Sequence, residues 1–125
     1  MIDILLSNSS GKPIYEQIAT QIRTQIMQGD LAAGEQLPSI RQLAADLRIS
    51  AITTKRAYAD LEAQGFIETV PGKGSFVAAD NLGLIQEERL RLVEAALAQA
   101  VEEAHAAGLG LKDVHAMLDL EWEEP

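Results

Sequence analysis

Two serines in helix-start positions, Ser39 and Ser50, constrain the fold of this 125-residue chain more than any other feature. Ser39 opens the sequence Ser-Ile-Arg-Gln, a capping box in which the serine accepts a hydrogen bond from the helix and the Gln42 side chain reaches back. Apolar residues at helical spacing follow and stop at the tight connection 47–49, after which Ser50 caps another helix that ends at Gly65. The pattern predicts a short helix, a tight turn and a second helix.

The flanking segments add one helix and one hairpin. An isoleucine at every fourth position predicts an amphipathic helix that begins near Pro13 and stops at Gly29: Ile14, Ile18, Ile22 and Ile26. A loop with a short strand before the next helix is expected at 31–37. The β-prone stretches 66–70 and 75–77 enclose Pro-Gly-Lys-Gly, which is strong turn chemistry. The first 78 residues are therefore predicted as helix, helix, helix and hairpin.

The third predicted helix, at about 51–64, has two chemically different faces. One side carries residues at core spacing, namely Thr54, Ala57, Tyr58 and Leu61. The other side begins with apolar, hydroxyl and basic residues, namely Ile52, Thr53, Lys55 and Arg56. Small alanines follow on that side, and acidic residues occur only in the later turns. A helix that enters the major groove of DNA needs cations and donors at its N-terminal tip and little bulk behind them, so this face is predicted to bind DNA.

The formal net charge of the chain is −9, but the charge is unevenly distributed. Residues 79–125 contain three Lys or Arg and eleven Asp or Glu, a balance of −8, whereas residues 1–78 contain seven and eight, a balance of −1. Residues 36–58 contain four basic residues and one acidic residue, a balance of +3. Binding to a polyanion depends on the local field, so the acidic composition does not exclude DNA as a partner of the middle of the chain.

Four separated motifs resemble the head of the GntR family of bacterial transcription regulators. They occur in the family's order within residues 10–78: PIYEQI at 13–18, GEQLPSIRQLA at 34–44, RAYADLEAQGFI at 56–67 and GKGSFV at 72–77. The resemblance implies a winged helix-turn-helix, in which the hairpin is the wing, and it places Arg41, Thr53, Lys55, Arg56 and the wing glycines and lysine against DNA. Together with the helix caps and the first turn of the third helix, the predicted DNA-binding residues are Ser39, Arg41, Ser50, Ala51, Ile52, Thr53, Lys55, Arg56, Gly72, Lys73 and Gly74.

Ala51 and Ile52 depart from the family, whose members often carry polar residues at these positions. Apolar contact with a thymine methyl is the expected replacement for hydrogen-bonded readout there. The departure leaves the operator sequence open.

Residues 79–125 are predicted to form two helices with a continuous apolar stripe. The stripe residues lie three and four positions apart: Leu90, Val93, Leu97, Ala100, Ala104, Leu111, Val114, Leu118 and Trp122. A helix cannot hide such a face alone, so the stripe packs either on the rest of its own chain or on a second copy. A dimer reads a palindrome with increased affinity, and the short two-helix tail resembles the YtrA subfamily, which implies a homodimer. We therefore predict that the tail dimerises.

Two alternatives remain open. A Lys-Arg pair on a helix is commonly solvated surface, and a winged helix with an acidic tail also suits protein binding without DNA.

His105 after Glu102, and His115 before Asp119, each place two potential metal ligands on one helix face, although such pairs arise readily by chance in a Glu-rich helix. The sequence contains no complete catalytic set, so we predict no enzyme activity, no metal site and no cofactor.

The predicted fold is mainly α with a small β-hairpin: a winged helix-turn-helix head at 1–78 and a helical dimerisation tail at 79–125. The predicted function is a sequence-specific repressor that binds double-stranded DNA as a homodimer on a palindromic operator. The absence of cysteine fits a reducing cytosol, and no apolar run is long enough to span a membrane. No signal peptide is recognised, so we predict a cytoplasmic protein without a membrane partner. The tail is too short for the large effector domain of most GntR relatives, so any small-molecule effector is unidentified. The YtrA resemblance also implies control of genes for ATP-binding cassette transporters.

Overall fold

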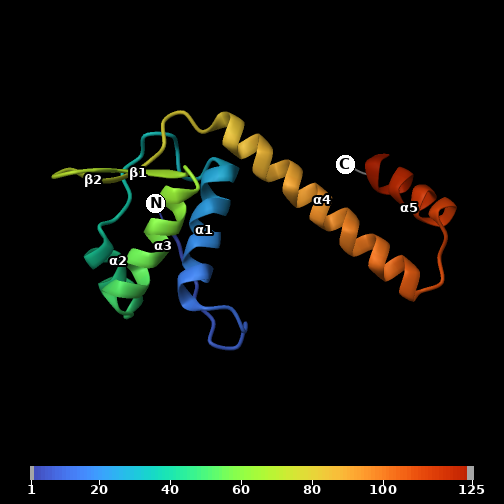
Figure 1. The fold of residues 1–125 in the computed structure, drawn as a ribbon, viewed down its shortest axis with the longest axis horizontal. Helices are drawn as coiled ribbons and strands as arrows, with labels where there is room; N and C mark the ends of the chain where they lie inside the picture. The colour runs from blue at the N-terminus through green and yellow to red at the C-terminus, as the bar shows by residue number, and fades with distance from the viewer. Residues whose placement is uncertain (1, 124–125) are drawn as a thin grey trace. The chain divides into compact units, whose positions relative to one another are not determined.

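The computed structural model describes residues 2–123, which form five helices and one two-stranded sheet (Figure 1). In chain order the elements are α1 (Ile14–Gln28), α2 (Ile40–Leu47), α3 (Ala51–Ala63), β1 (Ile67–Val70), β2 (Gly74–Val77), α4 (Leu82–Ala106) and α5 (Leu111–Glu123). Internal contacts divide the chain into two units, the head (Met1–Ile85) and the tail (Gln86–Pro125). The mainly α fold with a small hairpin is confirmed.

The helix starts follow the predicted caps with one exception. The Ser39 hydroxyl accepts a hydrogen bond from the backbone amide of Gln42 at 3.0 Å, and the Ser50 hydroxyl accepts one from the amide of Thr53 at 3.2 Å. The prediction that the Gln42 side chain reaches back to Ser39 is wrong. Its Nε2 instead donates to Oδ1 of Asp46 at 2.8 Å. Asp46 lies one turn further along the same face of α2, so the amide finds a charged acceptor there.

The three head helices and the hairpin enclose one hydrophobic core. Its largest fully buried side chains are Phe66, Ile18, Ile22, Leu31, Leu61, Ile67, Val77 and Thr54. The helix α1 supplies the predicted isoleucine stripe, and α3 supplies the predicted inner face. Leu84 and Ile85 also pack against this core, so the compact head extends from residue 78 into the first turn of α4.

The wing is anchored to the loop that enters α2. β1 and β2 pair antiparallel, and the segment before Pro38 lies beside β2 as a third extended stretch. The backbone amide of Leu37 donates to the carbonyl of Ser75 at 2.8 Å, and the amide of Val77 donates to the carbonyl of Glu35 at 2.8 Å. The base of the hairpin and the start of α2 are therefore parts of one hydrogen-bonded structure.

An N-terminal strap, residues 2–7, lies along α1 and is not foreseen by the sequence analysis. Three glutamines of α1 each bind the backbone N–H and C=O of one strap residue: Gln25 binds Asp3, Gln21 binds Leu5 and Gln17 binds Ser7. Four residues of an α-helix advance about 6 Å along its axis, and two residues of extended chain advance about 6.8 Å. Every fourth residue of α1 can therefore bind every second residue of the strap over this distance. The alternate strap residues, Ile2, Ile4 and Leu6, pack against the core.

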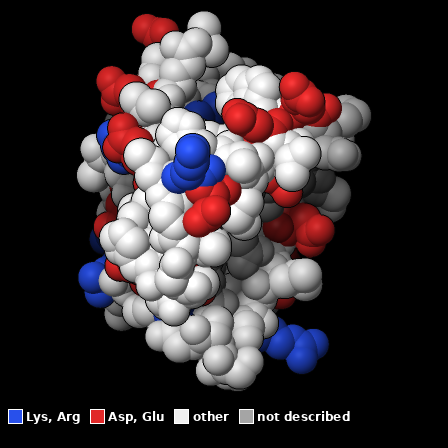
Figure 2. All heavy atoms as spheres, turned by 90° about the vertical axis from the view of Figure 1, so that its right-hand side faces the viewer, with Lys and Arg blue, Asp and Glu red and all other residues white. Residues whose placement is uncertain are grey.

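The tail contains α4 beyond its first turn, a turn at 107–110 and α5. Gly108 has φ +74, a left-handed conformation that suits a glycine after a helix. Of the predicted apolar stripe, Ala104 is buried and Val114 half-buried, and the other members are exposed. Figure 2, seen from the side of α5, shows acidic side chains scattered over a largely uncharged surface. None of the helices in the described part of the chain is both long and apolar enough to cross a membrane.

Candidate nucleic-acid interface

The helix α3 is held in place by its inner face, which leaves its outer face exposed. The inner residues Thr54, Ala57, Tyr58 and Leu61 are buried as predicted. The hydroxyl of Tyr58 donates to the carbonyl of Pro38 at 2.7 Å, which ties α3 to the loop before α2. Burial raises the pKa of Tyr58 far above its ordinary value, so the hydroxyl keeps its proton and remains a donor. On the opposite side, Ile52 is 82% exposed.

The first turn of α3 is organised by hydroxyl groups. The Ser50 and Thr53 hydroxyl oxygens lie 2.9 Å apart, and the Thr54 hydroxyl donates to the carbonyl of Ser50 at 3.2 Å. Ser50 and Ala51 are exposed at this end, where free backbone amides and the helix dipole favour an anion. The first turn therefore presents a fixed start of helix with a large exposed apolar side chain, Ile52, beside polar groups.

Arg56 makes a contact that the sequence analysis missed. Its guanidinium carbon lies 3.8 Å from the centre of the Tyr15 ring, so the planar group stacks on the first turn of α1. Stacking uses the face of the guanidinium and leaves its edge N–H donors available. Tyr15 belongs to the PIYEQI motif, but no local pattern could pair it with a residue 41 positions later. Packing of α1 against α3 alone brings the two together.

The remaining basic candidates are exposed on three different elements. Arg41 lies in the first turn of α2, Lys55 in the second turn of α3, and Lys73 in the turn between β1 and β2. The wing turn is closed by a hydrogen bond from the amide of Lys73 to the carbonyl of Val70 at 2.9 Å. Figure 1 shows the hairpin extending from the end of α3 toward the side of the head where α2 lies.

The wing turn depends on glycine. Gly72 has φ +77 and Gly74 has φ +123, and residues other than glycine rarely adopt either backbone conformation. Ser39, the remaining candidate, is exposed at the N-cap of α2, as described above. The predicted residues thus fall on three separate pieces of surface: the start of α2, the start of α3 with its second turn, and the wing turn.

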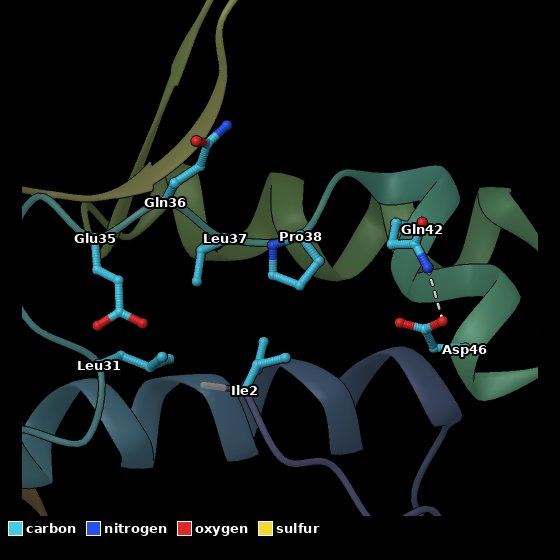
Figure 3. Close-up of a pocket in the computed structure, with 8 residues that line it drawn as sticks. All are labelled: Ile2, Leu31, Glu35, Gln36, Leu37, Pro38, Gln42 and Asp46. Carbon is cyan, nitrogen blue, oxygen red and sulfur yellow. Dashed lines mark hydrogen bonds between the residues drawn. The ribbon is translucent and has the colours of Figure 1, made fainter.

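The head also contains an acidic cavity that is unsuited to DNA. It has a volume of about 430 Å³ and is lined by Ile2, Leu31, Glu35, Gln36, Leu37, Pro38, Gln42 and Asp46. Figure 3 shows the carboxylates of Glu35 and Asp46 at its two ends. These charges repel phosphate, so the cavity is not part of the candidate interface. Within residues 2–123, no three His, Asp or Glu side chains come together where they could hold a metal ion, and this includes His105 and His115.

Comparison with known proteins places these elements in a family. Residues 14–77 match the family described as bacterial regulatory proteins, gntR family. The chain belongs to the GntR family. The HTH-type transcriptional repressor YtrA of Bacillus subtilis (strain 168) is 33% identical over 112 residues, which cover 90% of this chain and 86% of that protein. The matched segment runs from α1 to β2 and so contains every residue predicted to contact DNA.

Solved structures agree with this assignment. A GntR family transcriptional regulator from Listeria monocytogenes superposes with a TM-score of 0.74 at 32% identity, covering 89% of this chain and 96% of that one. The AraR DBD in complex with operator ORX1 superposes with a TM-score of 0.55 at 29% identity, covering 62% of this chain and 96% of that one. The predicted winged helix-turn-helix with a two-helix tail and the YtrA-like assignment are confirmed. As a GntR protein the chain is a transcription regulator and not an enzyme, and members of this family bind DNA.

Proposed function

We propose that this GntR protein is a cytoplasmic repressor that binds a palindromic DNA site as a homodimer, with α3 in the major groove and the wing beside it. The observation that carries the proposal is the exposure of the front of α3. Its inner residues are buried, while Ile52, Lys55 and Arg56 are exposed next to the capped first turn. A helix end with this chemistry suits entry into a major groove.

Direct readout is assigned to the first turn of α3. Ala51 and Ile52 have no side-chain hydrogen-bonding groups, so they read a base by apolar contact, and the thymine methyl is the matching group. Thr53 lies beside them and carries a hydroxyl that can serve any base edge. Ser39, Arg41 and Ser50 are assigned to phosphates, because exposed groups at helix starts commonly bind the DNA backbone.

Arg56 is assigned to a phosphate and not to a base. Its guanidinium carbon lies over the Tyr15 ring, so the side chain reaches across to the first turn of the neighbouring helix α1. Its edge donors can still form a bidentate pair with phosphate oxygens. Stacking restricts the long side chain before DNA arrives, which reduces the entropy lost on binding.

The homodimer is assigned to the tail. Leu90 is 58% exposed, Leu97 49% and Trp122 84%, which leaves a row of large apolar side chains without cover in a single chain. Exposed apolar surface of this kind is typical of an interface. A two-fold pair of heads would also match a palindromic site, and linking two recognition helices raises affinity without new contacts.

The test is DNA selection followed by a salt titration. The full chain selects sites from a random double-stranded library, and the enriched site is then titrated by fluorescence anisotropy at 50–300 mM salt. Roughly four phosphate contacts per subunit predict a log–log slope of about −7 for the dimer. Enrichment of a two-fold symmetric sequence with such a slope supports the proposal. No enrichment and a slope near zero would support the alternative, a winged helix that binds protein only.

Two substitutions separate base readout from phosphate positioning. Arg56→Ala should weaken the selected site and unrelated DNA by the same factor, and make the slope less negative by about 2 for the dimer. Ile52→Ala should leave the slope unchanged and reduce discrimination at one A·T position by about 1–2 kcal/mol. If Arg56→Ala instead relaxes the sequence preference, its assignment to phosphate is wrong.

A further inference from the structure

We propose that Gln36 positions the wing: its side-chain amide holds the turn that carries Lys73, and so determines where the Lys73 ammonium meets DNA. The inference rests on the proposed DNA binding and adds to it a residue that touches no DNA itself. Gln36 belongs to the loop before α2 and is exposed. Its effect on the wing is therefore separable from the packing of the core.

The contact is a single hydrogen bond to the wing turn. Nε2 of Gln36 donates to the backbone carbonyl of Lys73 at 3.0 Å. Figure 3 shows the Gln36 side chain pointing away from the acidic cavity and toward the hairpin, opposite to the direction of Glu35 and Leu37. The alternation of an extended segment explains this, because successive side chains point to opposite faces. Glu35 and Leu37, which bind the base of the hairpin through their backbones, therefore place the Gln36 side chain toward the hairpin.

Gly74 shows how closely the amide approaches the turn. A Cβ atom built on Gly74 would lie 2.9 Å from Nε2 of Gln36, closer than real Cβ contacts. A Cβ built on Gly72 would meet nothing within 4 Å. Both glycines adopt positive φ, but only Gly74 also makes room for a side chain. The Gln36 amide thus lies directly against the backbone of the turn at Gly74.

The tip of the wing has few other supports. Backbone hydrogen bonds with Glu35 and Leu37 hold β2 at Ser75 and Val77, and an isolated bridge pairs Gln36 with Phe76. On the other strand, the Glu62 carboxylate of α3 accepts a hydrogen bond from the amide of Thr69 at 3.0 Å. Beyond Gly74, the turn is closed by its own bond from Lys73 to Val70. A two-stranded hairpin is only marginally stable by itself, so the tip can pivot unless something outside the hairpin holds it. Gln36 supplies that restraint before DNA binds, and a preorganised contact loses less entropy on binding.

The same loop also connects the wing to α2. Gln36 lies three residues before Ser39, the N-cap of the helix that carries Arg41. A side chain that joins this loop to the wing turn therefore keeps two of the three candidate surfaces at a constant spacing. Correct spacing of phosphate contacts sets the register of a protein on the duplex.

The test is a double-mutant cycle between Gln36 and Lys73, measured on the DNA site that the wild-type chain selects. Gln36→Met keeps the length of the side chain and removes the donor, and should weaken binding by about 3–10-fold, the equivalent of one lost hydrogen bond. In the Lys73→Ala background the same change should have an effect below about 1.5-fold, because the group that Gln36 positions is gone. Gln28→Met, an exposed glutamine at the end of α1, is the matched control and should bind as the wild type does.

The salt slope and the melting temperature complete the experiment. Gln36→Met should make the slope less negative by up to about 2 for the dimer, with a melting temperature close to that of Gln28→Met. An equal loss in both Lys73 backgrounds, or no loss in either while the wild type binds with a steep slope, would overturn the inference and leave the proposed function standing. A wild-type chain that selects no DNA would overturn both.

Discussion

Leu61 in the head and Leu97 in the tail are both leucines on the apolar face of a helix. The Leu61 side chain is 0% exposed, whereas the Leu97 side chain is 49% exposed. In the head, the stripes of α1 and α3 meet one another and the hairpin closes over them. In the tail, the stripe of α4 and α5 is covered only near their turn, around Ala104. Helical periodicity therefore identifies an apolar face that needs a packing partner. It does not tell whether that partner is the same chain or another one.

The difference has a simple physical cause. The head packs three helices, a hairpin and the N-terminal strap around one core. These elements together cover the apolar faces of α1 and α3. The tail has most of one long helix and a second short helix, and two helices leave their outer apolar residues in water. A second copy is the covering that we propose.

The largest expected effect comes from one substitution made in both regions. Leu61→Ala removes a fully buried side chain and should lower the free energy of unfolding by about 2–5 kcal/mol. Leu97→Ala should change the unfolding of the isolated subunit little and should raise the dissociation constant of the dimer. Urea denaturation and sedimentation equilibrium measure the two quantities.

Protein concentration provides the control for this comparison. The stability of an obligate dimer depends on concentration, whereas that of a subunit packed on itself does not. If Leu97→Ala costs as much as Leu61→Ala at every concentration, then the tail packs on its own chain and the contrast between the regions disappears.

A medium effect is expected at the strap of the head. Gln17 is 8% exposed, and its amide binds Ser7 N and O, the Ser10 hydroxyl and the carbonyl of Lys12. Gln17→Met leaves these groups without a partner and should lower the free energy of unfolding by about 1–3 kcal/mol. Gln21→Met, the matched control, loses only the two bonds to Leu5 and should cost less. Thermal denaturation ranks them, and equal losses would mean that the strap adds no buried hydrogen bonding.

The smallest effect concerns Tyr58 and pH. Tyr58→Phe removes the hydrogen bond to Pro38 and should cost about 0.5–1.5 kcal/mol at pH 7. Because burial raises the pKa of Tyr58, its contribution is fully present below about pH 10, where the unfolded tyrosine starts to ionise, and is lost as pH rises further. Urea denaturation at pH 8 and pH 11 should therefore show the deficit of the variant shrinking at alkaline pH. A constant deficit would mean that Tyr58 ionises in the folded state as easily as in water.

Local signals predicted much of the head. Ser39 and Ser50 start helices and the inner face of α3 is buried as predicted, because caps and periodicity act over a few residues. The reach of Gln42 back to Ser39 was predicted wrongly, since Asp46 offers a stronger acceptor on the same face. The strap, the Tyr15–Arg56 stack and the Gln36 bond were not predicted. In each of these, the partners lie many residues apart, and no local pattern identifies them.

The sequence by itself determined the order of the elements, the positions of the helix caps, the buried face of α3 and the uneven distribution of charge, because these follow from neighbouring residues. The tertiary structure alone decided the long-range contacts: Arg56 rests on α1, Gln36 donates to the wing turn, and three glutamines bind the strap. The reason is that a hydrogen bond or a stacking contact depends on the distance between two atoms in space, and the chain sets that distance only when all of its elements have packed.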